Sequence, residues 1–219
     1  MTHIICLVGI MLTILWPNPS IISAQPPESP VSRSSPIDPD YIQAPVFTEN
    51  QDIPDWKARW ELAKILGYVK KYPESLVEYE KLLSEKPDLL EARIEMAQIL
   101  NWMGEPKKAI TIYEAHAEKL DERARLDMAD IYAAIKQYDR AEEIYQKHLK
   151  SAPADYRVRT RLAEILSWTG RYKESLAQFR QVLAQVPNDI QVRRKYAYVL
   201  IWNDQHEDAI IELRKTLNP

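Results

Sequence analysis

Arginine recurs in this sequence at a regular spacing that could form an anion-binding site. One arginine occupies the same position in each of five similar segments, at Arg59, Arg93, Arg125, Arg159 and Arg193. A row of five guanidinium groups facing solvent would bind an anionic chain. Each arginine, however, lies four residues before a small residue, about 40° from it around a helix, and we place that small residue on a buried stripe. We therefore expect the stems to be packed and the charged heads to pair with a carboxylate or a carbonyl.

Histidine and glycine give no catalytic pattern. His116 and His148 occupy one equivalent position in two different segments, whereas zinc sites of the HExxH type need two histidines on one helical turn. No Ser–His–Asp set or pair of carboxylates stands out, because carboxylates are spread over every predicted helix. The four glycines are far apart, which excludes a phosphate-cradling loop: Gly9, Gly67, Gly104 and Gly170. We predict no enzyme activity, no metal site and no cofactor.

Composition narrows the class of partner. Hydrophobic residues make up 46% of the 219 and charged residues 28%, which are values of a folded chain. The formal net charge of −3 gives no support for nucleic acid as a partner, because such binding favours a strong basic excess. The one cysteine, Cys6, lies in the apolar N-terminal run.

The first 54 residues differ from the rest. The run from Ile4 to Trp16 is apolar, and small residues follow before Gln25, so residues 1–24 are predicted to be a cleaved secretory signal peptide. An uncleaved anchor and an accident of composition are the alternatives, because the segment before the run has no Lys or Arg. Residues 25–54 hold seven prolines and are predicted to form a disordered linker, either a tether or a leader without a role. The protein is then periplasmic or secreted, and it meets a membrane only through the signal sequence or a partner.

From residue 55 onward the sequence repeats. Trp102, Trp168 and Trp202 are separated by 66 and 34 residues. A period of about 34 residues is typical of stacked helical hairpins. The hairpins align on an alanine that we call the anchor, with steps of 34, 32, 34 and 34 residues: Ala63, Ala97, Ala129, Ala163 and Ala197.

Further positions repeat with the anchor. Twelve residues after it stands a second small residue, which lets the two helices of a hairpin approach closely: Ser75, Ala109, Ala141, Ser175 and Ala209. Sixteen residues after it stands a large apolar residue that fills the gap: Tyr79, Tyr113, Tyr145, Phe179 and Leu213. Prolines are predicted to end three of the second helices. An aspartate after each proline is predicted to cap the next helix: Asp88, Asp155 and Asp189, with Asn188 as the alternative to the last of them.

This pattern resembles the tetratricopeptide repeat (TPR). The resemblance covers residues 55–219 in five units, at about 56–88, 89–121, 122–154, 155–188 and 189–217. It implies an all-α, right-handed α-solenoid of five helical hairpins and a protein-binding scaffold, whose concave groove holds an extended peptide or another partner. The step of 32 residues, with no proline between His116 and Arg125, predicts a tighter junction between the second and third units.

Three positions around the anchor form one stripe on each first helix, because they lie four residues apart. We predict this stripe as the partner-binding groove, and its candidate residues are Trp60, Lys64, Tyr68, Gln98, Trp102, Asp130, Glu164, Trp168, Arg194, Tyr198 and Trp202. Their aromatic rings suit a peptide or a stacked sugar ring. The alternative for Trp102, Trp168 and Trp202 is packing against the neighbouring unit, which leaves Trp60 as the better ligand candidate.

Two expectations about function follow. The string LSWTGRYKES at residues 166–175 is similar to repeats in bacterial envelope proteins of polysaccharide synthesis and export, which implies a scaffold in exopolysaccharide assembly. The alternative is a glycan-binding module that uses the groove aromatics. A repeat array also needs a cover on its last unit, so the C-terminal edge is predicted either to dock or self-associate or to meet a further part of a longer chain.

Overall fold

The computed structural model describes residues 52–217. The predicted signal peptide and residues 25–51 of the predicted linker lie outside the described residues. Within them the chain forms ten α-helices and one short 3₁₀ helix: α1 (Asp55–Tyr68), α2 (Tyr72–Glu85), α3 (Leu90–Trp102), α4 (Pro106–Ala115), η2 (Ala117–Lys119), α5 (Glu122–Ala134), α6 (Tyr138–Ser151), α7 (Tyr156–Trp168), α8 (Tyr172–Gln185), α9 (Ile190–Trp202) and α10 (His206–Arg214).

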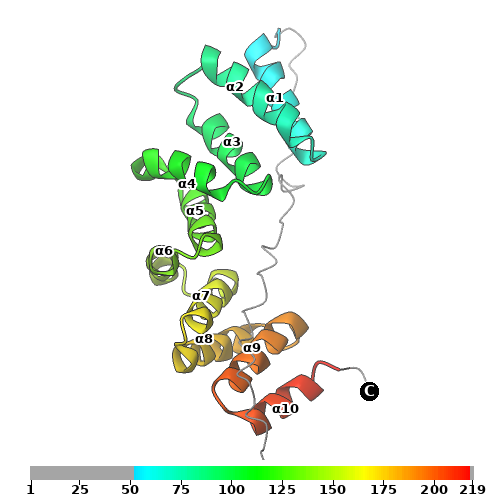
Figure 1. The fold of residues 1–219 in the computed structure, drawn as a ribbon, viewed down its shortest axis with the longest axis vertical. Coiled ribbons are helices and arrows are strands. Elements are labelled where there is room, and N and C mark those ends of the chain that lie inside the picture. The colour runs from blue at the N-terminus through cyan, green and yellow to red at the C-terminus, as the bar shows by residue number, and fades with distance from the viewer. Residues whose placement is uncertain (1–51, 218–219) are drawn as a thin grey trace, which may run out of the picture.

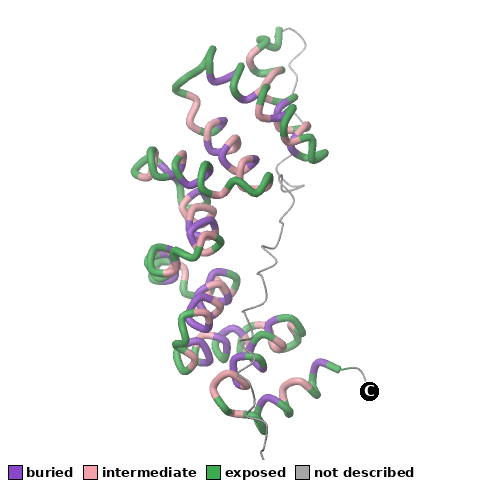
Figure 2. The backbone as a smooth tube through the Cα atoms, viewed as in Figure 1, coloured by how far each residue is buried: buried purple, intermediate pink, exposed green. Residues whose placement is uncertain are grey.

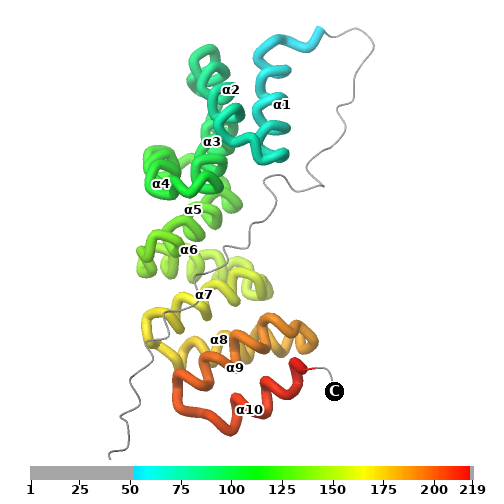
Figure 3. The backbone as a smooth tube through the Cα atoms, turned by 45° about the vertical axis from the view of Figure 1, so that its right-hand side comes forward, coloured from blue at the N-terminus to red at the C-terminus, as the bar shows by residue number. Residues whose placement is uncertain are grey.

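The helices pair into five antiparallel hairpins that stack in chain order, from α1–α2 at one end to α9–α10 at the other (Figure 3). The first and last hairpins are displaced to the same side of the middle ones, so the stack is an arc (Figure 1). Each of α2, α4, α6 and α8 packs against the odd-numbered helix that follows it. In addition, α1 contacts α3 directly, and α7 contacts α9. The predicted all-α solenoid of five hairpins is confirmed.

The anchor alanines hold each hairpin together. All five are fully buried, and so are the small residues twelve positions later, apart from a trace of exposure at Ala209. In the first and fourth hairpins that second residue is a serine, whose hydroxyl donates to the anchor's carbonyl oxygen at 2.7 Å in both Ser75 and Ser175. A larger side chain at either position would separate the helices, because packed interiors have no spare volume. Buried residues accordingly recur in every hairpin (Figure 2).

The corner inside each hairpin is the same left-handed turn. The residue seven positions after the anchor has a positive φ in all five hairpins, at Lys70, Gly104, Lys136, Gly170 and Asp204. The next N–H donates back to a carbonyl five residues earlier, as in Arg171 N to Leu166 O at 2.8 Å and Gln205 N to Leu200 O at 2.9 Å. These are Schellman caps, which end a helix in the left-handed conformation. Only two of the five corners use glycine, the residue that adopts this conformation without strain.

Aspartate caps begin two of the three helices for which they were predicted. Asp155 accepts from the backbone N–H groups of Arg157 and Val158, and Asp189 accepts from that of Val192. The prediction was wrong for Asp88. In the other two junctions the capping aspartate is two residues after proline, whereas Asp88 is one residue after Pro87. The N-cap of α3 is therefore Leu89, which has no side-chain acceptor.

The second unit is short because its second helix, α4, is short. α4 has 10 residues, whereas α2, α6 and α8 have 14 each. The chain leaves α4 at Ala115 and turns through η2, and Asp121 then caps α5 by accepting from Ala124 N at 2.7 Å. The junction between the second and third hairpins thus differs in shape from the other three.

The arginine row is structural, as predicted. Arg59 donates to Glu78 at 2.9 Å, and Arg159 donates to Gln178 at 2.8 Å and to Pro153 O at 2.7 Å. Arg193 repeats this arrangement with Glu212 and Pro187 O. Arg93 donates to Pro87 O, and Arg125 pairs with Glu122 on its own helix. Three heads therefore tie the first helix of a hairpin to the second, and three tie it to the preceding loop. They form no anion-binding track.

His148 is also held by neighbours. Its ring nitrogens lie 2.7 Å from Glu122 and 3.0 Å from Asp155, one on each side of the junction between the third and fourth hairpins. Burial alone would lower the pKa of His148, but the hydrogen bonds with these two carboxylates outweigh it and raise the pKa.

We predict that Lys136→Gly stabilises the fold by up to about 1 kcal/mol. The left-handed conformation costs a residue with a side chain about 1–2 kcal/mol, and the larger entropy that glycine loses on folding offsets part of the gain. Gly170→Ala should destabilise it by a similar amount. Urea unfolding followed by circular dichroism measures both. Lys173→Gly, in the first turn of α8, is the control and should be destabilising. Loss of stability in Lys136→Gly would contradict this account of the corners.

Candidate functional site

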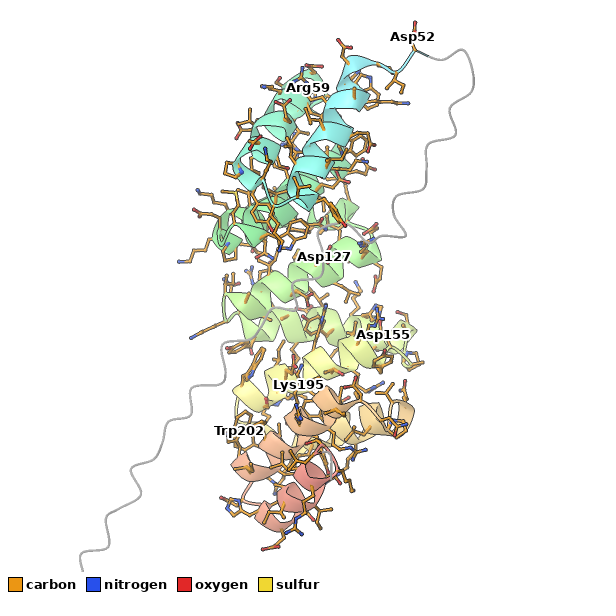
Figure 4. All side chains as sticks on the ribbon, turned by 90° about the vertical axis from the view of Figure 1, so that its right-hand side faces the viewer. Asp52, Arg59, Asp127, Asp155, Lys195 and Trp202 are labelled. Carbon is orange, nitrogen blue, oxygen red and sulfur yellow. The ribbon has the colours of Figure 1, made fainter. Side chains whose placement is uncertain are left out.

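The candidate site is the surface formed by the odd-numbered helices. Side chains of successive odd-numbered helices reach one another directly there, as expected on the inside of a curved stack. Asp127, Lys195 and Trp202 mark three levels of it in Figure 4. We call this surface the groove.

Polar pairs cross the groove at each junction, and they use one register. The residue one position after the anchor meets the residue two positions before the next anchor. Gln98 Nε2 donates to Asp127 Oδ2 at 2.8 Å, Asp130 pairs with Arg161, and Glu164 pairs with Lys195. These pairs hold neighbouring hairpins in register, and much of their hydrogen-bonding capacity is used within the chain.

At the first junction the same position is Glu95, which accepts hydrogen bonds from neutral groups. Trp60 Nε1 donates to it, and Tyr79 Oη donates to it at 3.0 Å. The Lys64 ammonium group is held by Glu61 at 2.6 Å and lies 5.3 Å from the Trp60 ring centre. Trp60, the candidate favoured by sequence, is thus a hydrogen-bond donor to the second hairpin and stacks on Trp56 at 6.5 Å between ring centres.

Three groove carboxyls in the second and third hairpins have raised pKa values. Burial raises the pKa of Glu95 and of Asp127, although each accepts hydrogen bonds that act in the opposite direction. Burial also raises the pKa of Asp130 to about 6, against the charge of Arg161 and the Tyr145 hydroxyl, which donates to it. Two of these three carboxyls accept hydrogen bonds from neutral donors. Trp60 and Tyr79 donate to Glu95, and Gln98 donates to Asp127.

Aromatic pairs cover three of the four junctions. Trp102, Trp168 and Trp202 each pack on the tyrosine that begins the second helix of the preceding hairpin. The ring centres are 6.4 Å apart for Trp102 and Tyr72, 5.7 Å for Trp168 and Tyr138, and 6.3 Å for Trp202 and Tyr172. The rings thus join hairpins as well as line the groove.

The remaining junction, between the second and third hairpins, has no ring pair, and a pocket lies there. Where the second and third hairpins meet, the equivalent positions are Pro106 and Ala134, and no ring pair forms between them. A pocket of about 310 Å³ opens at this junction. It is lined by Lys64, Tyr79, Leu90, Glu91, Ile94, Glu95, Gln98, Ile99, Trp102, Lys119, Leu120, Asp121, Arg123, Ala124 and Asp127. The short α4 and the turn through η2 place Lys119, Leu120 and Asp121 on its rim.

The structure distributes the predicted groove residues among different environments. Lys64, Gln98 and Trp102 line the pocket. Tyr68 and Tyr198 are exposed, and Tyr198 lies 6.3 Å from Trp202 between ring centres. Arg194 does not extend across the groove, because it donates to Thr216 O at 3.2 Å within its own hairpin. The other candidates make the junction contacts described above.

Sequence reasoning missed the partners of these residues. The position two before the anchor is charged in every unit, at Glu61, Glu95, Asp127, Arg161 and Lys195. It lies three residues from a position already assigned to the groove, hence on the same helix face. That regular charge was the available signal. The rim of the pocket had no signal of its own, because it depends on where α4 ends.

The comparisons with known proteins agree with this geometry. A family model described as tetratricopeptide repeat matches residues 136–195, which run from the corner before α6 into α9. The described chain is a TPR-like solenoid, and the family match itself covers the part from the corner of the third hairpin into α9. No curated protein matches the sequence.

Solved structures show the same fold. MamA from Desulfovibrio magneticus RS-1 (residue 41 to the end) has a TM-score of 0.69 at 17% identity, over 75% of this chain and 95% of that one. A tetratricopeptide repeat protein from Parabacteroides merdae has a TM-score of 0.65 at 21% identity, over 75% of this chain and 66% of that one. YrrB, described as a TPR protein with an unusual peptide-binding site, has a TM-score of 0.62 at 18% identity, over 74% and 84%. At these identities the likeness shows the fold alone.

Residues 52–217 lack two other kinds of feature. No group of three or more His, Cys, Asp or Glu side chains there could hold a metal ion. In the same range, none of the helices combines the length and the apolar character that crossing a membrane requires.

We predict that Asp130→Asn gains stability relative to the natural protein as the pH rises from about 4 to about 6.5. Because the fold raises the pKa of Asp130 to about 6 from its ordinary value of 3.8, the folded form binds more protons than the unfolded form in this window. Deprotonation therefore opposes folding, by on the order of 2 kcal/mol at neutral pH, whereas asparagine does not titrate.

Urea unfolding of both proteins at several pH values measures this difference. The exposed Asp52 provides the control, and Asp52→Asn should show no comparable change with pH. A stability difference between Asp130→Asn and the natural protein that is constant from about pH 4 to about pH 7 would show that Asp130 is not destabilised by burial.

Proposed function

We propose that the chain is a non-enzymatic scaffold that binds a segment of a partner protein in the groove, with the pocket between the second and third hairpins as its anchoring point. The pocket itself is the observation that carries this proposal. Its volume of about 310 Å³ is at the lower end for ligand sites, and suits one or two side chains of an extended segment.

The lining indicates what the pocket would accept. Leu90, Ile94 and Leu120 offer apolar walls, and the carboxyls of Glu95 and Asp127 accept hydrogen bonds from neutral donors. A segment that brings an apolar side chain together with N–H donors would complement both features. The TPR fold supports a protein partner, since its recurring use is protein binding.

We further propose that this scaffold works in the cell envelope, in the periplasm or after secretion, in exopolysaccharide assembly or export. The support is the apolar run from Ile4 to Trp16 with the small residues that follow it, and the likeness of residues 166–175 to repeats of envelope proteins. Fusion of residues 1–54 to a reporter enzyme that folds only outside the cytoplasm tests the location.

Site-specific photocrosslinking in the producing cells tests the groove. With the crosslinking residue at Glu91 or at Lys119, both exposed on the pocket, we expect one and the same protein to be captured. Asp127→Arg should reduce that capture about tenfold or more, because it fills the pocket and reverses its charge, which is worth at least about 1.4 kcal/mol.

Lys147, exposed on α6, is the control position and should capture nothing in common with the other two. Circular dichroism would show whether Asp127→Arg keeps the fold. Capture that is equal at Lys147 and at the pocket, or absent from both pocket positions, would contradict the proposed binding site.

A glycan ligand is the second candidate, and the neighbouring rings of Tyr198 and Trp202 favour it. Tyr198 is exposed, and sugar rings stack on exposed aromatic faces. Titration with a soluble β-glucan by calorimetry, compared between the natural protein and Tyr198→Ala, separates the two candidates. Binding that is lost in Tyr198→Ala supports the glycan, and absence of heat in both excludes this probe.

A further inference from the structure

The internal junctions of the array pack two largely apolar faces on each other, with Glu142, Thr169 and Asn203 as the polar exceptions. The odd-numbered helix contributes the receiving face, which consists of the residues one position before, two positions after and six positions after its anchor. The preceding even-numbered helix contributes the presenting face, which consists of the residues thirteen, sixteen and twenty positions after the anchor of the same hairpin. On α1 the receiving face consists of Leu62, Ile65 and Val69, and on α10 the presenting face consists of Ile210, Leu213 and Leu217.

The receiving face of α1 is uncovered. Ile65 is 57% exposed, whereas its equivalents in the other four hairpins are at most 3% exposed: Ile99, Ile131, Ile165 and Val199. Leu62 is 46% exposed, whereas Leu162 and Tyr196 are buried at the same position. The first unit therefore carries the residues of a repeat junction, and no described helix packs on them.

The presenting face of α10 is uncovered in the same way. Ile210 is 41% exposed, whereas its equivalent in the fourth hairpin, Leu176, is 2% exposed. Leu217 is exposed, whereas its equivalents Leu83 and Leu149 are buried. The two ends of the array are thus the two halves of one type of junction.

The polar contacts of a junction also find matching groups at the two ends. Inside the array the residue one position after an anchor pairs with the residue two positions before the next anchor, as Glu164 does with Lys195. At the ends these positions are Tyr198, a hydrogen-bond donor, and Glu61, an acceptor, and both are exposed. The ring pair of Tyr172 and Trp202 likewise has its counterpart in His206 and Tyr68, which are exposed too.

We infer that a second copy of this chain stacks head to tail on the first, with α10 of one copy on α1 of the next. All three kinds of junction contact then recur: the apolar faces meet, the Tyr198 hydroxyl of one copy donates to Glu61 of the next, and His206 packs on Tyr68. Because the two surfaces differ, the contact is heterologous and leaves both outer ends free, so it adds copies in series. The groove continues from one copy into the next. This inference does not depend on what the groove binds.

Sedimentation velocity of the full chain at increasing concentration tests it. The natural protein should pass beyond the mass of two copies, since the contact does not close. Ile65→Lys and Ile210→Lys should each remain monomeric, because each places an ammonium group in one half of the junction. Both residues are exposed, so circular dichroism should show the same helical content in both variants as in the natural protein.

Mixing the two variants is the decisive step. The first retains an intact presenting face and the second an intact receiving face, so an equimolar mixture should form a species of two copies and stop there. Val77→Lys, at an exposed apolar position of α2 outside both faces, is the matched control and should associate as the natural protein does.

Three results would overturn the inference. The natural protein could remain monomeric up to its solubility limit. Either single variant could still associate, which would place the contact elsewhere. The mixture could stay monomeric although the natural protein associates, which would show that α10 of one copy does not pair with α1 of the next.

Discussion

The close approach of two helices at a buried alanine is the constraint on which this solenoid depends. The five anchor alanines and the small residues opposite them leave no space between the helices of a hairpin, so the large residue at Tyr79 or Phe179 must lie beside the contact. That placement determines which side chains face the next hairpin. The arginine heads and the left-handed corners then fix the loops at both ends of the contact. The fold is this contact repeated, with each hairpin supported by its neighbours.

The groove is a consequence of the same stacking. Successive odd-numbered helices lie close enough for side chains to pair across the junction, as Asp130 does with Arg161 and Glu164 with Lys195. Where a ring pair covers the junction, the groove is filled, as at Trp168 and Tyr138. Where the second unit is two residues short, α4 ends early, and the turn through η2 places Lys119, Leu120 and Asp121 beside a pocket. The short second unit thus contributes to the pocket that we propose as the anchoring point.

Regular stacking also has a cost at the ends. A repeat unit presents one apolar face and receives another, and the internal junctions bury both. The first and last described helices keep these faces, with Ile65 and Ile210 exposed. Exposed apolar surface of this kind marks an interaction site in soluble proteins. The matching register of the two ends is the physical reason to expect a copy of the same chain there.

Much of this architecture could be predicted from the sequence. The period, the anchor alanines such as Ala163, and the arginine positions determined the hairpins and the register of all five units, because burial of a small residue is a local requirement that recurs. The capping of α7 by Asp155 could be predicted for the same reason, and the error at Asp88 came from a single-residue shift relative to proline.

Only the tertiary structure decided which groove residues are available. A stripe on one helix identifies what faces the groove, but it cannot show that Gln98 is held by Asp127 or that Trp202 is covered by Tyr172, since those partners belong to neighbouring hairpins. The pocket was also decided there, because it depends on where α4 stops and on how the second and third hairpins pack. The sequence predicted the open C-terminal edge, and the structure added the matching face of α1. The sequence by itself determined the repeated unit, and the packing of units determined the surfaces.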